Sequence, residues 1–200
     1  MVIKFIIVAI IAYLLGSIST GLILARICGG PNLREVGSKN TGASNVLRTM
    51  GLKSGLITFL GDAGKAALSC GIGWWITGTI YGAMLAGLFV ILGHNWPVFF
   101  QFKGGKGVAS SCGVMVVCFP IPALICFVIT IALIYFTRYI SLGSMTMLTL
   151  YGIIVSVQHN SDPYIIAWCA VLAVLCILRH RANIKRLMNG TENKLGQKVK

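Results

Sequence analysis

Charged residues, and acidic residues above all, are scarce in this chain of 200 residues. Only 10% of the residues are charged, and Asp and Glu together number four. A soluble domain carries about 25% charged residues, whereas 56% of this chain is hydrophobic and its mean hydropathy is +0.86. This composition excludes an ordinary soluble globular protein and indicates an integral membrane protein.

Several common motifs are also missing. The seven cysteines form no CxxC pair, so we interpret them as small hydrophobic residues rather than as a disulfide framework or metal ligands. The GxxxxGK[ST] signature is absent, which excludes a Walker A loop. No internal repeat, low-complexity tract or second soluble domain is visible, and we therefore predict a single transmembrane domain over residues 1–200.

We predict an all-α fold with about seven transmembrane helices. A span needs about 20 apolar residues, and the apolar stretches lie near residues 3–25, 54–76, 81–101, 108–120, 122–137, 142–157 and 164–179. Pro120 and Pro122 split the region 108–137 into two short pieces. A five-span arrangement, in which this region crosses less regularly, therefore stays open.

The distribution of Lys and Arg predicts the orientation. All 17 of these residues except Lys4 and Lys65 fall in segments that lie on one side of the membrane when the spans alternate. Because Lys and Arg in short loops favour the cytoplasmic side, we predict an external N-terminus, a cytoplasmic C-terminus and a cytoplasmic working face. The net charge of +13 then favours anionic lipid headgroups and phosphorylated substrates over nucleic acid.

The first of three cytoplasmic polar stretches covers residues 29–53. A helix that begins near Thr41 would place Asn45 and Arg48 on one face, which suits a phosphate. Gly37 and Gly42 permit a close backbone approach. A polar loop with a capped amphipathic helix at the interface is the alternative.

The second stretch, residues 101–107, interleaves three glycines with Lys103 and Lys106 immediately before an apolar helix. Backbone N–H groups, ammonium groups and a helix N-terminus can together enclose an anion. A flexible basic turn at the membrane interface is the alternative. His94, just upstream, is interpreted as a hydrogen-bonded interface residue.

The third stretch covers residues 179–200. If the last span continues as a helix, His180 and Asn183 share one face. A plain positive-inside stop would explain the arginines equally well. Inside the second predicted span, Asp62 and Lys65 are three residues apart, and we predict a structural ion pair because either charge alone in hydrocarbon is costly.

Together, the three stretches resemble the signature motifs of one bacterial family. The segments 37–48 (GSKNTGASNVLR), 94–107 and 180–187 (HRANIKRL) are similar, in the same order, to those of the membrane-bound acyl-phosphate-dependent glycerol-3-phosphate acyltransferases. The similarity extends over nearly the whole chain. Lys39 and Ser44 stand where some members carry Gly and Thr.

The resemblance implies an enzyme of the bacterial inner membrane that starts phospholipid synthesis. A fatty acyl group would pass from acyl phosphate to the 1-hydroxyl of sn-glycerol 3-phosphate, giving lysophosphatidic acid and phosphate. The partners would be these two substrates and membrane lipid, without metal, cofactor, acyl-CoA or nucleic acid, and we expect a functional monomer. No His is followed four residues later by Asp, the dyad of the unrelated acyl-CoA enzymes.

The site residues follow from the resemblance and from the chemistry of phosphate binding. Catalytic roles are predicted for Ser38, Arg48, Lys106, His180 and Asn183, and substrate-binding roles for Asn40, Thr41, Gly42, Asn45, Lys103, Gly104, Gly105 and Gly107. The proton of the attacking hydroxyl would pass either to His180 or to the donor phosphate, and the second route is favoured because no carboxylate in the motifs orients a histidine base. Two other functions stay open at this point: a transporter for an organic phosphate and a non-catalytic lipid-binding protein.

Overall fold

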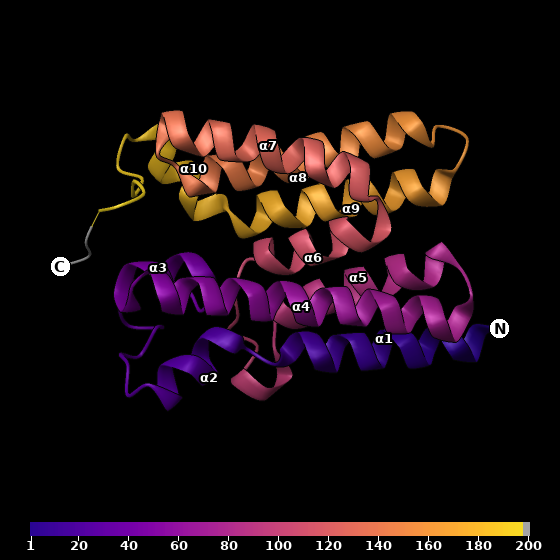
Figure 1. The fold of residues 1–200 in the computed structure, drawn as a ribbon, viewed down its shortest axis with the longest axis horizontal. Coiled ribbons are helices and arrows are strands. Elements are labelled where there is room, and N and C mark those ends of the chain that lie inside the picture. The colour runs from indigo at the N-terminus through magenta and orange to yellow at the C-terminus, as the bar shows by residue number, and fades with distance from the viewer. Residues whose placement is uncertain (198–200) are drawn as a thin grey trace. The chain divides into compact units, whose positions relative to one another are not determined.

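The structure, a computed structural model, describes residues 1–197, which form helices and no strand. Within this range the chain divides into two compact units, Met1–Cys118 (unit 1) and Phe119–Gln197 (unit 2) (Figure 1). The basic residues Lys198 and Lys200, which the sequence places in the third cytoplasmic stretch, lie outside the described residues. The single domain over residues 1–200 stays a prediction.

Unit 1 contains six α-helices and one short 3₁₀ helix. They are α1 (Val2–Ser17), α2 (Thr20–Ile27), α3 (Ala43–Met50), α4 (Leu52–Thr77), α5 (Ile80–Asn95), η1 (Val98–Phe100) and α6 (Val108–Cys118). Helices α1, α4 and α5 pack against one another, and α6 packs on α4 and α5 (Figure 1). The crossing of α1 and α5 depends on glycine, since a Cβ at Gly16 would collide with the carbonyl of Val90 and one at Gly93 with that of Tyr13. Small residues at such crossings are typical of membrane helices.

The length of the first apolar stretch predicts one continuous helix. The structure instead has a break at Ile18 and Ser19, which separates α1 from α2. Beyond this break, at the polar end of unit 1, the chain builds a small hydrophobic core. Ala25 of α2, Leu33 of the following loop and Val46 of α3 are buried there, and Leu22 and Met50 pack against them. This core fixes the polar stretch 33–48 to the helices.

Unit 2 contains α7 (Pro120–Thr137), α8 (Ile140–Gln158), α9 (Pro163–Arg179) and α10 (Arg181–Met188). Helix α8 packs against both α7 and α9. Proline stands in the first turn of α7 and of α9, where its missing N–H costs nothing. Asp162 caps α9 by accepting hydrogen bonds from the N–H groups of Tyr164 (3.0 Å) and Ile165 (3.2 Å).

A helix lies at every predicted apolar stretch, but fewer than seven helices have the length and composition of a span. Four segments among residues 1–197 do: Val2–Ile27, Ile80–Phe100, Pro120–Thr137 and Ile140–Gln158. A fifth is added if α9 and α10, which meet at a bend of 60°, count as one. Helix α4 carries Asp62 and Lys65 and is not among them, and α6 is only 11 residues long. The prediction of an all-helical fold is confirmed, whereas the count of seven spans is not.

Candidate active site

Asn45 organises the first polar stretch from within. Its side chain is 1% exposed, and its Oδ1 accepts a hydrogen bond from the backbone N–H of Ser38 at 2.8 Å. Its Nδ2 donates to the carbonyls of Leu33 (3.0 Å) and Val36 (3.2 Å). The side-chain amide of Asn45 therefore holds the backbone of residues 33–38 in place through three hydrogen bonds. Its predicted contact with substrate stays a prediction, and the structure gives it a second role in positioning Ser38.

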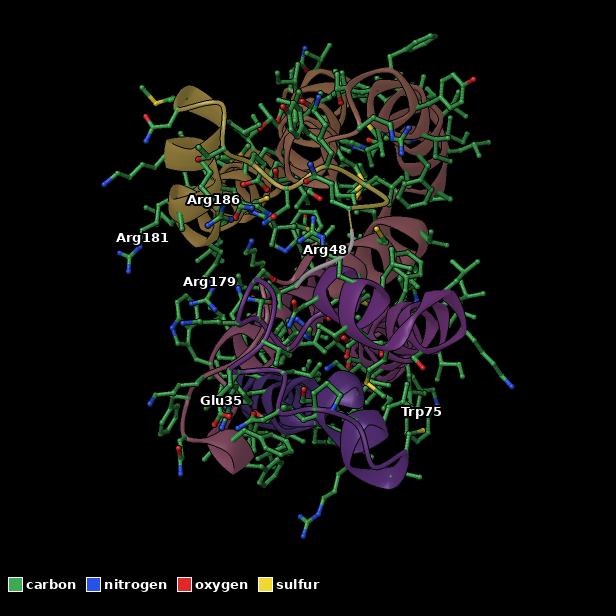
Figure 2. The ribbon with its side chains drawn as sticks, turned by 90° about the vertical axis from the view of Figure 1, so that its left-hand side faces the viewer. Glu35, Arg48, Trp75, Arg179, Arg181 and Arg186 are labelled. Atoms are coloured by element: carbon green, nitrogen blue, oxygen red, sulfur yellow. The ribbon has the colours of Figure 1, made fainter. Side chains whose placement is uncertain are left out.

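The loop then turns into α3 at Gly42, slightly later than the start near Thr41 that the sequence predicts. Asn40 Oδ1 accepts from the N–H of Gly42 at 3.0 Å, which closes the turn into the helix. Ser38 and Arg48 are half-buried, and Arg48 lies in the last turn of α3 (Figure 2). This arrangement gives the first stretch a fixed backbone with polar side chains along it.

The second polar stretch begins at the end of α5 and folds back on it. The N–H of Gly105 donates to the carbonyl of His94 at 3.0 Å. A Cβ at Gly104 would collide with this carbonyl, and one at Gly105 with the His94 ring. Close packing on His94 therefore requires glycine at both positions. The N–H of Gly105 is used within the fold, and the predicted role of Gly105 in substrate binding stays a prediction.

Further hydrogen bonds tie the second stretch to α1 and to the first stretch. The hydroxyl of Tyr13 donates to the carbonyl of Trp96 at 2.8 Å, and the N–H of Val98 donates to Ser17 Oγ at 3.3 Å. Arg34, in the first stretch, donates from Nη2 to the carbonyls of Phe100 (2.6 Å) and Lys103 (2.9 Å). The structure thus brings the first two stretches together through Arg34, a residue that the sequence analysis missed.

A buried polar network lies between the helix break and the second stretch. Lys65 Nζ is 2.8 Å from Asp62 Oδ1 and donates to the carbonyls of Gly16 (3.0 Å) and Ile18 (2.5 Å), two carbonyls at the break. Thr20 donates to Asp62 Oδ1 at 3.0 Å, and His94 Nδ1 is 3.3 Å from Lys65 Nζ. The predicted Asp62–Lys65 pair is confirmed. The structure adds that the pair stabilises the break and supports His94.

Several buried polar side-chain atoms in unit 1 have no hydrogen-bond partner within residues 1–197. They include Arg34 Nε and Thr41 Oγ1 in the first stretch, Asn95 Oδ1 at the end of α5, and Ser110 Oγ in the first turn of α6. Buried polar atoms in native proteins are nearly always paired, so such atoms indicate a place for water or a ligand. Thr41 is among the predicted substrate-binding residues. Asn95 and Ser110 were missed, although their polarity stands out beside apolar helices.

The third stretch does not continue the last span as a straight helix, as the sequence analysis expected. Helix α9 ends at Arg179, the chain bends by 60°, and α10 begins at Arg181. His180 sits at the bend, 2% exposed, with Nδ1 2.8 Å from the carbonyl of Cys176. Since a carbonyl only accepts, Nδ1 carries a proton, and in the neutral ring the lone pair is on Nε2.

Asn183 of α10 is bound to a carboxylate that the sequence analysis did not assign to the site. Its Nδ2 donates to Glu192 Oε1 at 2.7 Å, and Ser141 of α8 donates to the same oxygen at 2.9 Å. Arg186 donates to Glu192 Oε2 at 2.7 Å. Figure 2 shows Arg186 close to the helices and Arg181 pointing away from them. A partner nine residues away in a coil segment leaves no periodic signal that would reveal Glu192.

The charge of Glu192 is stabilised in place. Burial alone would raise the pKa of its carboxyl group, but the hydrogen bonds from Asn183 and Ser141 and the guanidinium of Arg186 together hold this pKa below its usual range. Glu192 is 5% exposed and accepts all three donors as a carboxylate. The side chain of Asn183 is therefore held in one orientation.

The predicted site residues fall into two groups. Unit 2 contains His180 and Asn183. Unit 1 contains all the others: Ser38, Asn40, Thr41, Gly42, Asn45, Arg48, Lys103, Gly104, Gly105, Lys106 and Gly107. Lys103 is exposed and Lys106 half-buried, on a backbone that is tied to α1, α5 and Arg34. Within residues 1–197 no three His, Cys, Asp or Glu side chains are placed to bind a metal ion. A reaction without metal stays a prediction.

Comparisons with known proteins agree with the family that the three stretches predict. Residues 6–190 match the family described as glycerol-3-phosphate acyltransferase. The chain is 44% identical over 191 residues to the glycerol-3-phosphate acyltransferase of Thermoanaerobacter pseudethanolicus, covering 96% of both chains. It is 40% identical over 186 residues to that of Bacillus subtilis, covering 93% of this chain and 95% of the relative.

A solved structure is similar over the same length. It is a crystal structure of PlsY (YgiH), an integral membrane glycerol 3-phosphate acyltransferase, in its glycerol 3-phosphate form. It is 38% identical to this chain with a TM-score of 0.90, and 96% of each chain is covered. This chain therefore belongs to the glycerol-3-phosphate acyltransferase family, as an all-helical integral membrane enzyme.

Proposed function

We propose that the acyl donor is a fatty acyl phosphate and that the acceptor is the 1-hydroxyl of sn-glycerol 3-phosphate. The hydroxyl oxygen attacks the acyl carbonyl carbon, the bond from this carbon to the phosphate oxygen breaks, and lysophosphatidic acid and phosphate are released. This is the first acylation of phospholipid synthesis. The observation that carries the proposal is that the two stretches bearing Arg48, Lys103 and Lys106 are hydrogen-bonded to each other in unit 1.

The chemistry needs positioning and charge rather than a nucleophilic side chain. An acyl phosphate is already activated, so the enzyme has to hold two anionic groups close together. Proximity and orientation supply about 7–11 kcal/mol, and one donor to the developing oxyanion about 2.7–4 kcal/mol. Ser38, Asn40, Arg48, Lys103 and Lys106 bind the two phosphates in this proposal, and the guanidinium of Arg48 binds one of them bidentately.

His180 and Asn183 orient glycerol 3-phosphate or the leaving phosphate. The proton of the attacking hydroxyl passes either to Nε2 of His180 or to an oxygen of the donor phosphate. The carbonyl of Cys176 supports the first route, because it holds Nδ1 as a donor and so makes Nε2 basic. The orienting carboxylate that a histidine base often has is replaced here by a backbone carbonyl.

The direct test incubates the purified protein with palmitoyl phosphate and glycerol 3-phosphate and measures lysophosphatidic acid by mass spectrometry. Product from palmitoyl phosphate but not from palmitoyl-CoA supports the proposed donor, and the reverse result overturns it. Uptake of glycerol 3-phosphate into sealed vesicles without new lipid would favour a transporter instead. Regiochemistry follows from the position of the acyl group in the product.

Two variants test the residue roles. Arg48→Ala should lower kcat/KM at least about 100-fold, which corresponds to about 2.7 kcal/mol of transition-state stabilisation, while folded protein stays in the membrane. Unchanged kcat/KM would remove Arg48 from the site. His180→Gln should flatten the pH–rate profile and lower kcat by several orders of magnitude if His180 is the base, and should cost only modestly if it positions substrate.

We also propose a bacterial inner-membrane location, seven spans, an external N-terminus, a cytoplasmic active site and a functional monomer. The excess of Lys and Arg on one predicted side supports the orientation. Cys28 is the one exposed cysteine among the described residues and precedes the first cytoplasmic stretch. A membrane-impermeant maleimide should therefore label it in inverted vesicles and not in intact spheroplasts, and the opposite pattern would reverse the topology.

A further inference from the structure

The turn that carries Lys103 has an unusual backbone. Gln101 and Phe102 are consecutive, neither is glycine, and both are left-handed, with φ angles of 58° and 57°. Side chains with a Cβ disfavour this region, and two such residues in succession are rarer still. Two backbone hydrogen bonds close the turn, from Phe102 to the carbonyl of Pro97 (2.9 Å) and from Lys103 to that of Phe100 (3.2 Å). Strained backbone of this kind persists only where the surrounding structure holds it.

Arg34 holds this turn at the carbonyls on either side of the strained pair. Its Nη2 donates to the carbonyl of Phe100, just before Gln101, and to that of Lys103, just after Phe102. These contacts span 66 and 69 residues of sequence, so they are not local consequences of the turn. The guanidinium thus bridges both ends of one strained segment.

The backbone around Arg34 is itself held by hydrogen bonds. The preceding residue, Leu33, is fully buried, and its carbonyl accepts from Asn45 Nδ2 at 3.0 Å. The N–H of Arg34 donates to Asn32 Oδ1 at 3.2 Å. Asn45 also holds the N–H of Ser38. The buried side-chain amide of Asn45 therefore fixes both the backbone next to Arg34 and the backbone of Ser38.

No acidic side chain among the described residues forms a salt bridge with Arg34. None of the salt bridges among residues 1–197 includes it, and the adjacent Glu35 accepts instead from Asn32 Nδ2 at 2.6 Å. The guanidinium binds backbone carbonyls of the lysine-bearing turn instead. This use indicates a role in geometry rather than in charge neutralisation.

We infer that Arg34 is a positioning residue for the acyl transfer. It keeps the turn 100–103 in its strained conformation, so that Lys103 and the following Gly104–Gly105–Lys106 segment are presented together with Ser38 and Arg48. The inference goes with the proposed phosphate-binding roles of these lysines. A lysine at position 34 would keep the charge, but its ammonium nitrogen lies one bond closer to the backbone than Nη2 of arginine, so it would not reach both carbonyls in the same way.

The experiment compares Arg34→Ala and Arg34→Lys with the parent enzyme in the lysophosphatidic acid assay, varying each phosphorylated substrate in turn. Both variants should raise KM for at least one substrate about tenfold or more, with a smaller change in kcat, and folded protein should remain in the membrane although two hydrogen bonds are lost or weakened. Added methylguanidinium should restore part of the activity of Arg34→Ala. Arg26→Ala, at an exposed position on α2, is the matched control and should keep parent kinetics with and without methylguanidinium.

Each result decides between the inference and its alternatives. If both Arg34 variants keep the parent KM and kcat, the inference is wrong. If Arg34→Lys alone is fully active, the charge and not the bridge matters, and the positioning role is also wrong. If the apparent kcat falls only in proportion to the amount of folded protein, while KM is unchanged and methylguanidinium restores no activity, Arg34 serves stability only. A parent enzyme that is inactive with palmitoyl phosphate would instead refute the proposed donor.

Discussion

Each unit contains one buried carboxylate that gathers donors around it, but the two carboxylates organise different kinds of structure. Asp62, 1% exposed in unit 1, projects from the middle of α4 and accepts from Lys65 and Thr20 at a break between helices. Glu192, 5% exposed in unit 2, comes from the coil after α10 and accepts from Ser141, Asn183 and Arg186. The first joins helix to helix, and the second joins a coil to helices.

The difference shows what a membrane chain with four acidic residues does with them. In unit 1 the cation paired with Asp62 is Lys65, which also donates to the carbonyls of Gly16 and Ile18 at the break between α1 and α2. Removal of the Asp62 carboxylate therefore leaves the Lys65 ammonium without a counter-charge in an apolar region. In unit 2 the partner Arg186 has a side chain 34% exposed, so water can solvate it when the carboxylate is lost. We therefore expect the two sites to differ in how much stability they contribute.

The largest effect is expected at Asp62. Asp62→Asn leaves Lys65 without a compensating charge, and breaking a buried pair in this way costs about 3–5 kcal/mol. The apparent Tm in detergent, followed by tryptophan fluorescence, should fall by roughly 10 °C. The double variant Asp62→Asn with Lys65→Met should be less destabilised than the single one, because no unpaired charge remains. A single variant as stable as the parent would contradict the role of the pair.

A smaller loss is expected for Glu192→Gln. The amide keeps an oxygen for Ser141 and Asn183, but its NH₂ group then faces the Nε–H of Arg186, two donors against each other. Losing one charge-assisted hydrogen bond to a partly exposed arginine costs about 1–3 kcal/mol. The same fluorescence measurement should show a decrease in Tm smaller than that of Asp62→Asn. Equal decreases would show that exposure of the partner does not matter.

The pH dependence sharpens this comparison. The pKa of Glu192 is lower in the folded protein than in the unfolded chain, where it is about 4.3. Its contribution to stability is therefore complete above the unfolded pKa and is lost as the pH falls through the folded pKa. The difference in Tm between the parent and Glu192→Gln should be largest at neutral pH and shrink below about pH 4. A difference that is constant from neutral to acidic pH would exclude the charge of Glu192 as its source.

The sequence predicted what depends on local pattern and missed what depends on distant partners. Apolar stretches gave the positions of the helices, and the spacing of Asp62 and Lys65 gave their pair. The contacts of Arg34 and of Glu192 with Ser141 join residues 51 to 69 positions apart, and no periodicity encodes them. The break at Ile18 carries no proline, and the freed carbonyls are satisfied by a lysine 47 residues further on. The bend at His180 likewise has no breaker residue.

The smallest effects are expected where a helix in each unit ends in a left-handed residue. Gly78 (φ 70°) caps α4 and Arg138 (φ 65°) caps α7. Their N–H groups donate to the carbonyls of Trp74 and Ile134 respectively. Gly78→Ala introduces a Cβ into this conformation and should cost about 1 kcal/mol.

Arg138→Gly should be close to neutral. It relieves the same strain but loses the hydrogen bond from Arg138 Nη2 to the carbonyl of Leu195 (2.8 Å), which is exposed and contributes about as much. Arg138→Ala is the matched control, since it loses the hydrogen bond and keeps the strain, and it should be less stable than Arg138→Gly. If Ala and Gly at position 138 give the same Tm, the left-handed cap of α7 is not strained, and the cost expected for Gly78→Ala, whose Cβ would meet no atom within 4 Å, loses its basis as well.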